Sequence, residues 1–198
     1  MPAVFACHKA VMRLTVFALV LAVGTGYVLG GRLARLAAVR IRLPWLAFAG
    51  IALQLAPVAG TAGYVVLLAS FAMLLAFTGL NIRAAGFVLI AVGLVLNCAV
   101  IAANRGMPVT RSALVSSGQA SLYEDLLRNG GTKHHLATDD ELFPFLGDVI
   151  PIGPPVRQAV SIGDLWVYAG GFWFIVAGMR RRRAVPSASH APIAEASR

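Results

Sequence analysis

Residues 43 to 82 form a run of 40 positions without a single charged side chain. A helix rises about 1.5 Å per residue, so about 20 apolar residues cross the roughly 30 Å hydrocarbon core of a bilayer. The run has twice that length, and the sequence PVAGTAG at 57–63 places Pro and Gly near its middle, where they favour a turn. The run therefore predicts a hairpin of two membrane-spanning helices.

Three further uncharged runs lie at 14–31, 84–104 and 165–179. Together the runs predict an all-α membrane protein with about five transmembrane helices. We expect these helices near 13–31, 43–58, 63–80, 86–103 and 163–179. The composition agrees, because charged residues make up 13% of the chain, about half their share in soluble domains, and the mean hydropathy is +0.78.

The arginines indicate how such a chain lies in the membrane. They flank the first predicted span (Arg32, Arg35, Arg40, Arg42), the fourth (Arg83) and the last (Arg180, Arg181, Arg182, Arg183). Basic residues gather on the cytoplasmic side, so we expect the N-terminus outside and the C-terminus inside, in a cell (plasma) membrane. The arginines at 180–183 are expected to meet anionic lipids. Because the net charge of +9 arises beside apolar runs and no nucleic-acid-binding motif is present, we expect no nucleic-acid partner.

The segment from 104 to 162 differs from the rest of the chain. Seven of the eight acidic residues lie between 124 and 164. Thr110, Ser121-Leu122-Tyr123-Glu124 and Thr138-Asp139-Asp140-Glu141 resemble helix starts, so we expect a structured, partly helical outer loop of about 60 residues. The apolar residues between 142 and 150 are expected to bury against the membrane surface or the helix ends.

The predicted organisation of the whole chain has five parts. They are 1–12 as an N-terminal extension, 13–103 as a four-helix transmembrane region, 104–162 as an extracytoplasmic loop region, 163–180 as a fifth helix and 181–198 as a basic, disordered cytoplasmic tail.

Four short motifs in this order resemble a family of small bacterial integral membrane proteins known only as a domain of unknown function. They are NRGMPV at 104–109, KHHL at 133–136, LGDVIP at 146–151 and SIGD at 161–164, and an early GGRL at 30–33 also fits. The resemblance covers nearly all of residues 12 to 180. It implies a membrane location in the bacterial envelope and carries no activity.

Two Gly-Asp pairs supply the candidate chemistry. Asp164 opens the last predicted helix, where a carboxylate interacts well with unpaired N–H groups, and Ser161 is a competing cap. Alternatively, Asp148 and Asp164 face each other and divide acid and base roles, which makes them the candidate catalytic residues. The Asn104-Arg105-Gly106 turn and the Gly-Asp that opens the last helix faintly resemble lipoprotein signal peptidase, an intramembrane aspartyl peptidase. In that family the other catalytic Asp follows a Gly-Asn pair by a few residues, whereas here Pro151 lies in that region and Asp148 directly follows Gly147.

Polar residues inside or beside the predicted helices are the candidate binding residues. They are Gln54, Asn97, Asn104, Lys133, His134 and Tyr168. Buried polar groups in a bilayer often mark a site, although Gln54 and Asn97 also suit mutual hydrogen bonding as packing contacts. His134, His135, Asp139, Asp140 and Glu141 are clustered, but their spacing matches no metal motif, so we expect neither a metal nor a cofactor.

The sequence leaves three functional classes open. The first is an integral membrane protein of the envelope that binds a lipid, peptide or protein partner at its outer face. The second is a membrane-embedded, aspartyl-peptidase-like hydrolase that uses Asp148 and Asp164. A transporter is the third, and the short chain without detectable inverted repeats disfavours it.

Overall fold

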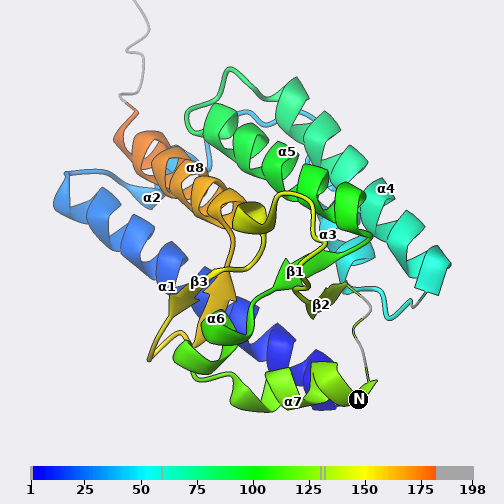
Figure 1. The fold of residues 1–198 in the computed structure, drawn as a ribbon. Coiled ribbons are helices and arrows are strands. Elements are labelled where there is room, and N and C mark those ends of the chain that lie inside the picture. Colours follow the sequence, from blue (N-terminus) through cyan, green and yellow to red (C-terminus); the bar gives the residue numbers. More distant parts are fainter. Residues whose placement is uncertain (1, 59, 130, 132, 182–198) are drawn as a thin grey trace, which may run out of the picture.

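The computed structural model describes residues 2–58, 60–129, 131 and 133–181, and it is mostly helical (Figure 1). The longer helices are α1 (Pro2–Val28), α3 (Trp45–Leu55), α4 (Gly60–Leu80), α5 (Phe87–Asn104) and α8 (Ile162–Arg180). Shorter elements are α2 (Leu33–Leu36), β1 (Met107–Val109), α6 (Arg111–Ser116), α7 (Ala120–Asn129), β2 (His134–Leu136), the 3-10 turn η1 (Pro144–Leu146), β3 (Ile150–Ile152) and β4 (Gln158–Val160). The helical character predicted from the sequence is confirmed.

Three helices, α4, α5 and α8, are long and apolar enough to cross a membrane. The apolar part of α1, Met12–Val28, and the whole of α3 are shorter, so the count of five spans stays a prediction. Helix α3 is shorter than the expected 43–58 because prolines bound it. Pro44 is its N-cap, and Ala56, which precedes Pro57, has the extended backbone (φ −63°, ψ 130°) that a following proline favours.

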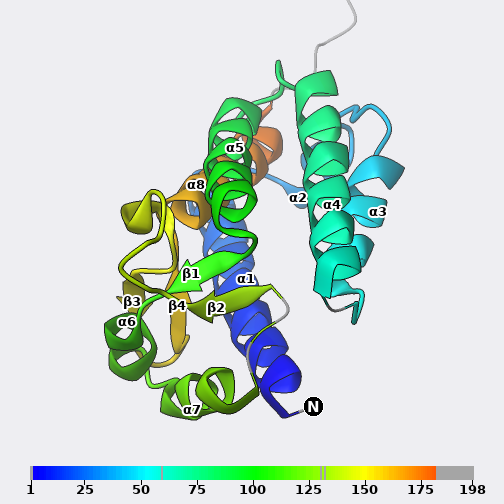
Figure 2. The same ribbon diagram turned by 45° about the vertical axis from the view of Figure 1, so that its right-hand side comes forward.

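The long helices pack in the order α1, α8, α5, α4 and α3, and α3 and α4 form a pair beside the others (Figure 2). Glycines bring α5 and α8 close together. A Cβ atom on Gly170 of α8 would lie 2.5 Å from the backbone oxygen of Gly86, and one on Gly93 of α5 would lie 2.9 Å from the backbone nitrogen of Val167. The two backbones therefore touch without intervening side chains, as small residues permit in membrane helices.

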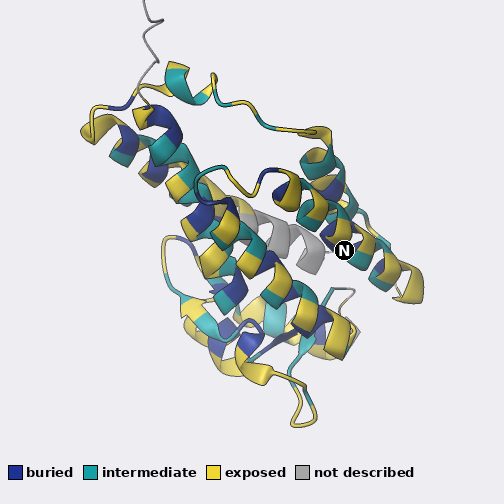
Figure 3. Cartoon of the chain, turned by 90° about the horizontal axis from the view of Figure 1, so that it is seen from above, coloured by how far each residue is buried: buried dark blue, intermediate teal, exposed yellow. Residues whose placement is uncertain are grey.

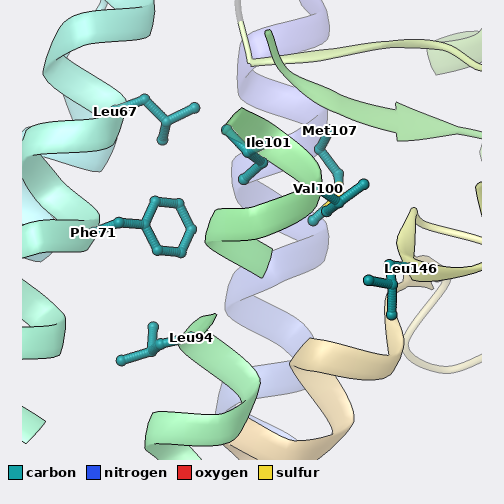
Figure 4. Close-up of a cluster of buried hydrophobic side chains, with 7 residues drawn as sticks. All are labelled: Leu67, Phe71, Leu94, Val100, Ile101, Met107 and Leu146. Carbon is teal, nitrogen blue, oxygen red and sulfur yellow. The ribbon is translucent and has the colours of Figure 1, made fainter. Parts of the chain in front are cut away.

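Apolar side chains lie both inside and outside this bundle. Leu67 and Phe71 of α4 meet Leu94, Val100 and Ile101 of α5, and the buried cluster continues to Met107 and Leu146 (Figure 4). Exposed residues also run along the helices (Figure 3), and many are large and apolar, including Val20, Phe48, Val65 and Trp173. Helices with apolar outward faces are typical of proteins that bury those faces in lipid.

The 104–162 segment forms a small mixed unit at one end of the bundle (Figure 1). Strands β1 and β2 pair in parallel with Met107 opposite His134, and β3 and β4 form an antiparallel hairpin with Ile150 opposite Val160. These short strands are not foreseen in the predicted all-α class with its partly helical outer loop, and the chain remains mostly helical. Helices α6 and α7 complete the unit over the buried residues Val109, Ala113, Leu114, Leu126 and Ala159. Backbone pairing satisfies peptide groups that a loop in this position would leave unpaired.

The helix starts and apolar residues expected in this unit agree with the structure in part and differ from it at Thr138. Thr110 caps α6 as expected, since its Oγ1 accepts from the Ala113 amide at 3.3 Å. The residues around Thr138, however, form a turn and no helix, and its hydroxyl donates to Glu141 Oε1 at 3.3 Å. Among the apolar residues expected to bury against the membrane surface or the helix ends, Leu146 is buried within the protein. Leu142, Phe143 and Phe145 are 57%, 52% and 60% exposed, so their burial against the membrane surface stays a prediction.

The opposite end of the bundle carries the arginines of the first loop, of the turn between α4 and α5, and of the end of α8. The amide of Arg32 donates to the carbonyl of Met179 at 2.9 Å, which ties the first loop to the end of α8. Asn81, at the end of α4, accepts from the Arg42 amide at 2.7 Å and donates to the Arg42 carbonyl at 2.9 Å. Arg182 and Arg183 lie outside the described residues.

Candidate functional site

The start of α8 is built by Ser161 and Asp164. Ser161 is the N-cap, and its Oγ accepts from the Asp164 amide at 3.0 Å. In return, the Asp164 carboxylate accepts from the Ser161 amide at 3.2 Å, so the two residues form a capping box. This arrangement satisfies two of the N–H groups that a helix start leaves unpaired. The helix-start role suggested for Asp164 is therefore present, and Ser161 completes it.

Asn97 of α5 joins this helix start to the neighbouring span. Its Nδ2 donates to Asp164 Oδ1 at 2.7 Å, and its Oδ1 accepts from the Ser161 hydroxyl at 2.9 Å. Asn97 is only 6% exposed. Gly163 lies against its side-chain amide, where a Cβ atom would collide with it. Asn97 thus bonds to α8 and makes no pair with Gln54, whose side chain forms no hydrogen bond with any residue that the structure describes.

Asp148 lies beside this network in a different environment. Its backbone joins the small sheet, since its amide donates to the Pro108 carbonyl at 2.9 Å and its carbonyl accepts from the Thr110 amide at 3.3 Å. The residue is 7% exposed, and its Oδ1 has no hydrogen-bond partner among the described residues. A buried, unpaired carboxylate oxygen is costly, because burial removes water without replacing it. Burial, followed by the nearby charge of Asp164, raises the pKa of Asp148 well above its usual value.

His134 lies beside Asp148, with 3.6 Å between His134 Nε2 and Asp148 Oδ2. Burial lowers the pKa of His134. The charge of Asp164 opposes this shift, and Lys133 and His135 reinforce it. Both pKa shifts favour the uncharged forms of the two side chains.

The structure gives the other candidate residues different positions. The side chain of Asn104 holds the backbone of Leu142, accepting from its amide at 2.9 Å and donating to its carbonyl at 2.8 Å. Tyr168 lies one turn after Asp164, and its hydroxyl is 3.2 Å from Thr15 Oγ1 of α1. The Lys133 carbonyl accepts from the Met107 amide at 2.8 Å, within the β1–β2 pairing. Asn104 and Tyr168 therefore fix neighbouring segments.

The histidine and acid cluster does not assemble into a metal site. His135 Nε2 lies 2.8 Å from Glu141 Oε1, while the other histidine, His134, points to Asp148. No group of three or more possible ligands occurs within 2–58, 60–129, 131 and 133–181. The arrangement brings together Asn97, Asp148, Asp164 and His134, and it leaves Gln54 apart on α3.

One buried polar residue that the sequence-based interpretation missed is Asn81. Its amide makes three hydrogen bonds, two to the backbone of Arg42 and one to the Phe77 carbonyl at 2.8 Å. Asn81 is the last polar residue before Arg83 in the uncharged run of 43–82. An amide in such a run is expensive to leave unpaired, which is the signal that would have identified it.

The comparisons with known proteins agree with the resemblance seen in the sequence. No curated protein and no solved structure matches the chain. Residues 38–176 match the model of a family of unknown function, DUF5317. The match includes Asn97, Asn104, His134, Asp148 and Asp164, whereas the GGRL motif at 30–33 lies outside it. Because the matched range covers well over half of the chain, this protein belongs to the DUF5317 family of unknown function.

Proposed function

We propose that this chain is an integral membrane protein of the bacterial cell envelope that binds a lipid, peptide or protein partner at its outer face. In this proposal, α1, α3, α4, α5 and α8 all cross the plasma membrane, the 104–162 segment lies outside and the C-terminus lies in the cytoplasm. The acids lie mostly in the 104–162 segment, whereas the arginines of the first loop, the turn at Arg83 and the end of α8 flank the helices in short segments, and this distribution supports the orientation.

The observation that carries the binding proposal is the exposed apolar surface formed by Leu142, Phe143 and Phe145. Two anchors hold it in place, because Asn104 bonds both backbone groups of Leu142 and Leu146 is buried against α5. The turn η1 packs against both α5 and α8, so the surface lies at the ends of these two helices that the proposal assigns to the outer side. A rigid apolar surface at that level suits a lipid chain or an apolar segment of a partner.

Photocrosslinking in intact membranes tests this proposal. A photoreactive phenylalanine analogue replaces Phe143 or Phe145, and the control carries it at Leu127, which is 55% exposed on α7. We expect defined adducts from 143 and 145 and none from 127, and the mass of each adduct distinguishes a lipid from a peptide or protein. Equal labelling at all three positions, or no adduct at 143 and 145, contradicts the proposal.

A second candidate function is a membrane-embedded hydrolase that uses Asp148 and Asp164. Its support is the unpaired Asp148 Oδ1 and the electrostatic coupling of the two carboxyl groups, whose surroundings differ. Against it, both oxygens of Asp164 are occupied by Ser161 and Asn97. The geometry therefore favours the binding function.

Asparagine substitutions separate the two functions. Both Asp164 oxygens accept hydrogen bonds, and an asparagine there keeps only one acceptor, so Asp164→Asn should cost about 1–3 kcal/mol of stability even if Asp164 only starts α8. A hydrolase loses nearly all function from either Asp148→Asn or Asp164→Asn while the chain remains folded and inserted. Complementation of a deletion phenotype under envelope stress is the measurement, and full complementation by both variants at normal protein levels excludes the hydrolase.

A further inference from the structure

A cavity of about 650 Å³ lies at the arginine end of the molecule. Four arginines from three separate parts of the chain line it: Arg40 and Arg42 from the loop before α3, Arg83 from the turn between α4 and α5, and Arg181 from the end of α8. Its volume falls in the range of about 300–1,000 Å³ that is typical of small-molecule sites. Three segments distant in sequence thus deliver the same functional group to one space.

The charge of this cavity is not balanced by any acidic residue that the structure describes. None of the four arginines forms an ion pair within the part of the chain that the structure describes, where the ion pairs involve Glu124, Glu141 and Asp148 at the opposite end. No acidic residue precedes Glu124 in the sequence. Four like charges around one cavity repel one another, and an anion between them would reduce that repulsion. The missing counter-charge is the first indication of an anionic ligand.

Hydrogen bonds to the backbone also hold the segments around the cavity in place. Asn81 is 6% exposed and lines the cavity, and its amide fixes both backbone groups of Arg42. The adjoining turn is closed by the Ala84 amide, which donates to the Asn81 carbonyl at 2.8 Å. On the other side, the bond from Arg32 to Met179 holds the first loop against α8. The backbone that carries Arg42 is therefore placed before any ligand arrives, which lowers the entropic cost of binding.

We propose that this cavity binds a phosphate or phosphodiester group. Guanidinium groups present planar, forked donors that match phosphate oxygens, and several of them together exceed what one surface contact provides. The cavity wall also includes Val39, Leu80 and Ile82, so apolar surface lies beside the charged groups. An anionic lipid headgroup and a free phosphate share the recognised chemistry, and basic cavities at the ends of membrane helices are suited to lipid headgroups. The positive-inside rule alone accounts for arginines at this end but requires no shared cavity.

The test uses the full chain in detergent and measures its thermal stabilisation during titration with phosphatidylglycerol, phosphatidylcholine and inorganic phosphate. We expect saturable stabilisation by phosphatidylglycerol and none by phosphatidylcholine. If inorganic phosphate stabilises to the same extent and displaces the lipid, the source is a soluble phosphate; if it does neither, the source is the lipid. Equal stabilisation by both lipids, without an effect of phosphate, overturns the proposal.

Matched variants locate the effect in the cavity. Arg42→Gln and Arg83→Gln are each expected to weaken binding roughly tenfold or more, as expected for the loss of a charged hydrogen bond. Arg32→Gln is the control, because Arg32 is exposed in the same basic loop and does not line the cavity. Arg42→Lys keeps the charge but loses the forked geometry, so it covers the case in which Arg42→Gln fails to fold, and we expect it to bind more weakly than the natural chain. Equal affinity in all four variants overturns the proposal.

Discussion

The two Gly-Asp pairs look alike in the sequence but carry acids in opposite situations. Asp164 is satisfied by Ser161 and Asn97, while Asp148 is buried with an unpaired oxygen. The sequence allowed the role of Asp164 to be predicted, because a helix start is a local feature. It did not predict the partner on α5 or the burial of Asp148, because both depend on contacts between segments distant along the chain, such as the bond from the Asp148 amide to Pro108.

The raised pKa of Asp148 predicts a pH-dependent stability. Because the folded-state pKa lies above the unfolded value of 3.8, the folded chain keeps a proton on Asp148 at pH values where the unfolded chain has already released it. This contribution to stability is complete below pH 3.8 and is lost as the pH rises through the folded-state pKa, at about 1.4 kcal/mol per pH unit within that window. Asp148→Asn should remove this loss. Thermal midpoints of the natural chain and the variant across the pH range check it, and parallel curves contradict it.

Asn97→Leu tests the network that joins α5 to α8. The change removes one donor to Asp164 and the acceptor of the Ser161 hydroxyl, leaving buried polar groups unpaired. We expect a loss of about 1–3 kcal/mol in the free energy of unfolding. Val95→Leu is the control, since Val95 lies on the same helix and is 53% exposed. Denaturation in mixed micelles is the measurement, and an equally small loss in both variants refutes the structural importance of the network.

At the scale of elements, the helices were predictable and the strands were not. Uncharged runs located α4, α5 and α8 to within a few residues, because spanning a bilayer imposes a length that is visible in one dimension. Strands β1 to β4 have three residues each, too few for an alternating pattern, and two contain proline. Strand β1 pairs with β2, and each paired residue of β2 lies 27 positions after its partner in β1. No local sequence signal reveals a pairing over that distance.

Neighbouring glycines of α8 provide a prediction about helix packing. A Cβ atom on Gly170 would lie 2.6 Å from Ile90 Cγ1 and 2.8 Å from its backbone nitrogen, whereas one on Gly171 would meet nothing within 4 Å. Gly170→Ala should therefore destabilise the chain by about 1–3 kcal/mol through overpacking against α5. Gly171→Ala should be neutral or stabilising by up to about 1 kcal/mol, because alanine favours a helix. Unfolding in mixed micelles compares the two, and similar values contradict the close approach of α5 and α8.

At the scale of the molecule, one hydrogen-bonded contact bears on the number of spans. Asn81 binds the backbone of Arg42, so the chain leaves and returns to the same end of the bundle between these residues. Helix α4 has 21 residues and rises about 31 Å on the return. The preceding segment must cover the same distance in the opposite direction, although its helix α3 has only 11 residues and rises about 16 Å. The extended backbone at Ala56 adds to that reach, which supports a crossing that helix length alone does not reveal.

This geometry predicts which positions meet water on each side of the membrane. Single cysteines replace Thr61 at the start of α4, Leu127 on α7 and Arg83 in the turn after α4, in a chain whose Cys7 and Cys98 are changed to alanine. In intact cells stripped of any outer barrier, a membrane-impermeant maleimide should label 61 and 127, and it should label 83 only after the membrane is opened. Thr61 and Leu127 share a side because an even number of crossings, α4 and α5, separates them.

Two other labelling patterns contradict this prediction. Labelling of 83 from outside with protection of 127 means an inverted chain, which would place the exposed surface at 142–145 in the cytoplasm and remove the basis for outer-face binding. Protection of 61 together with labelling of 127 would instead mean that α4 and α5 do not both cross, contrary to the length and hydropathy of these two helices.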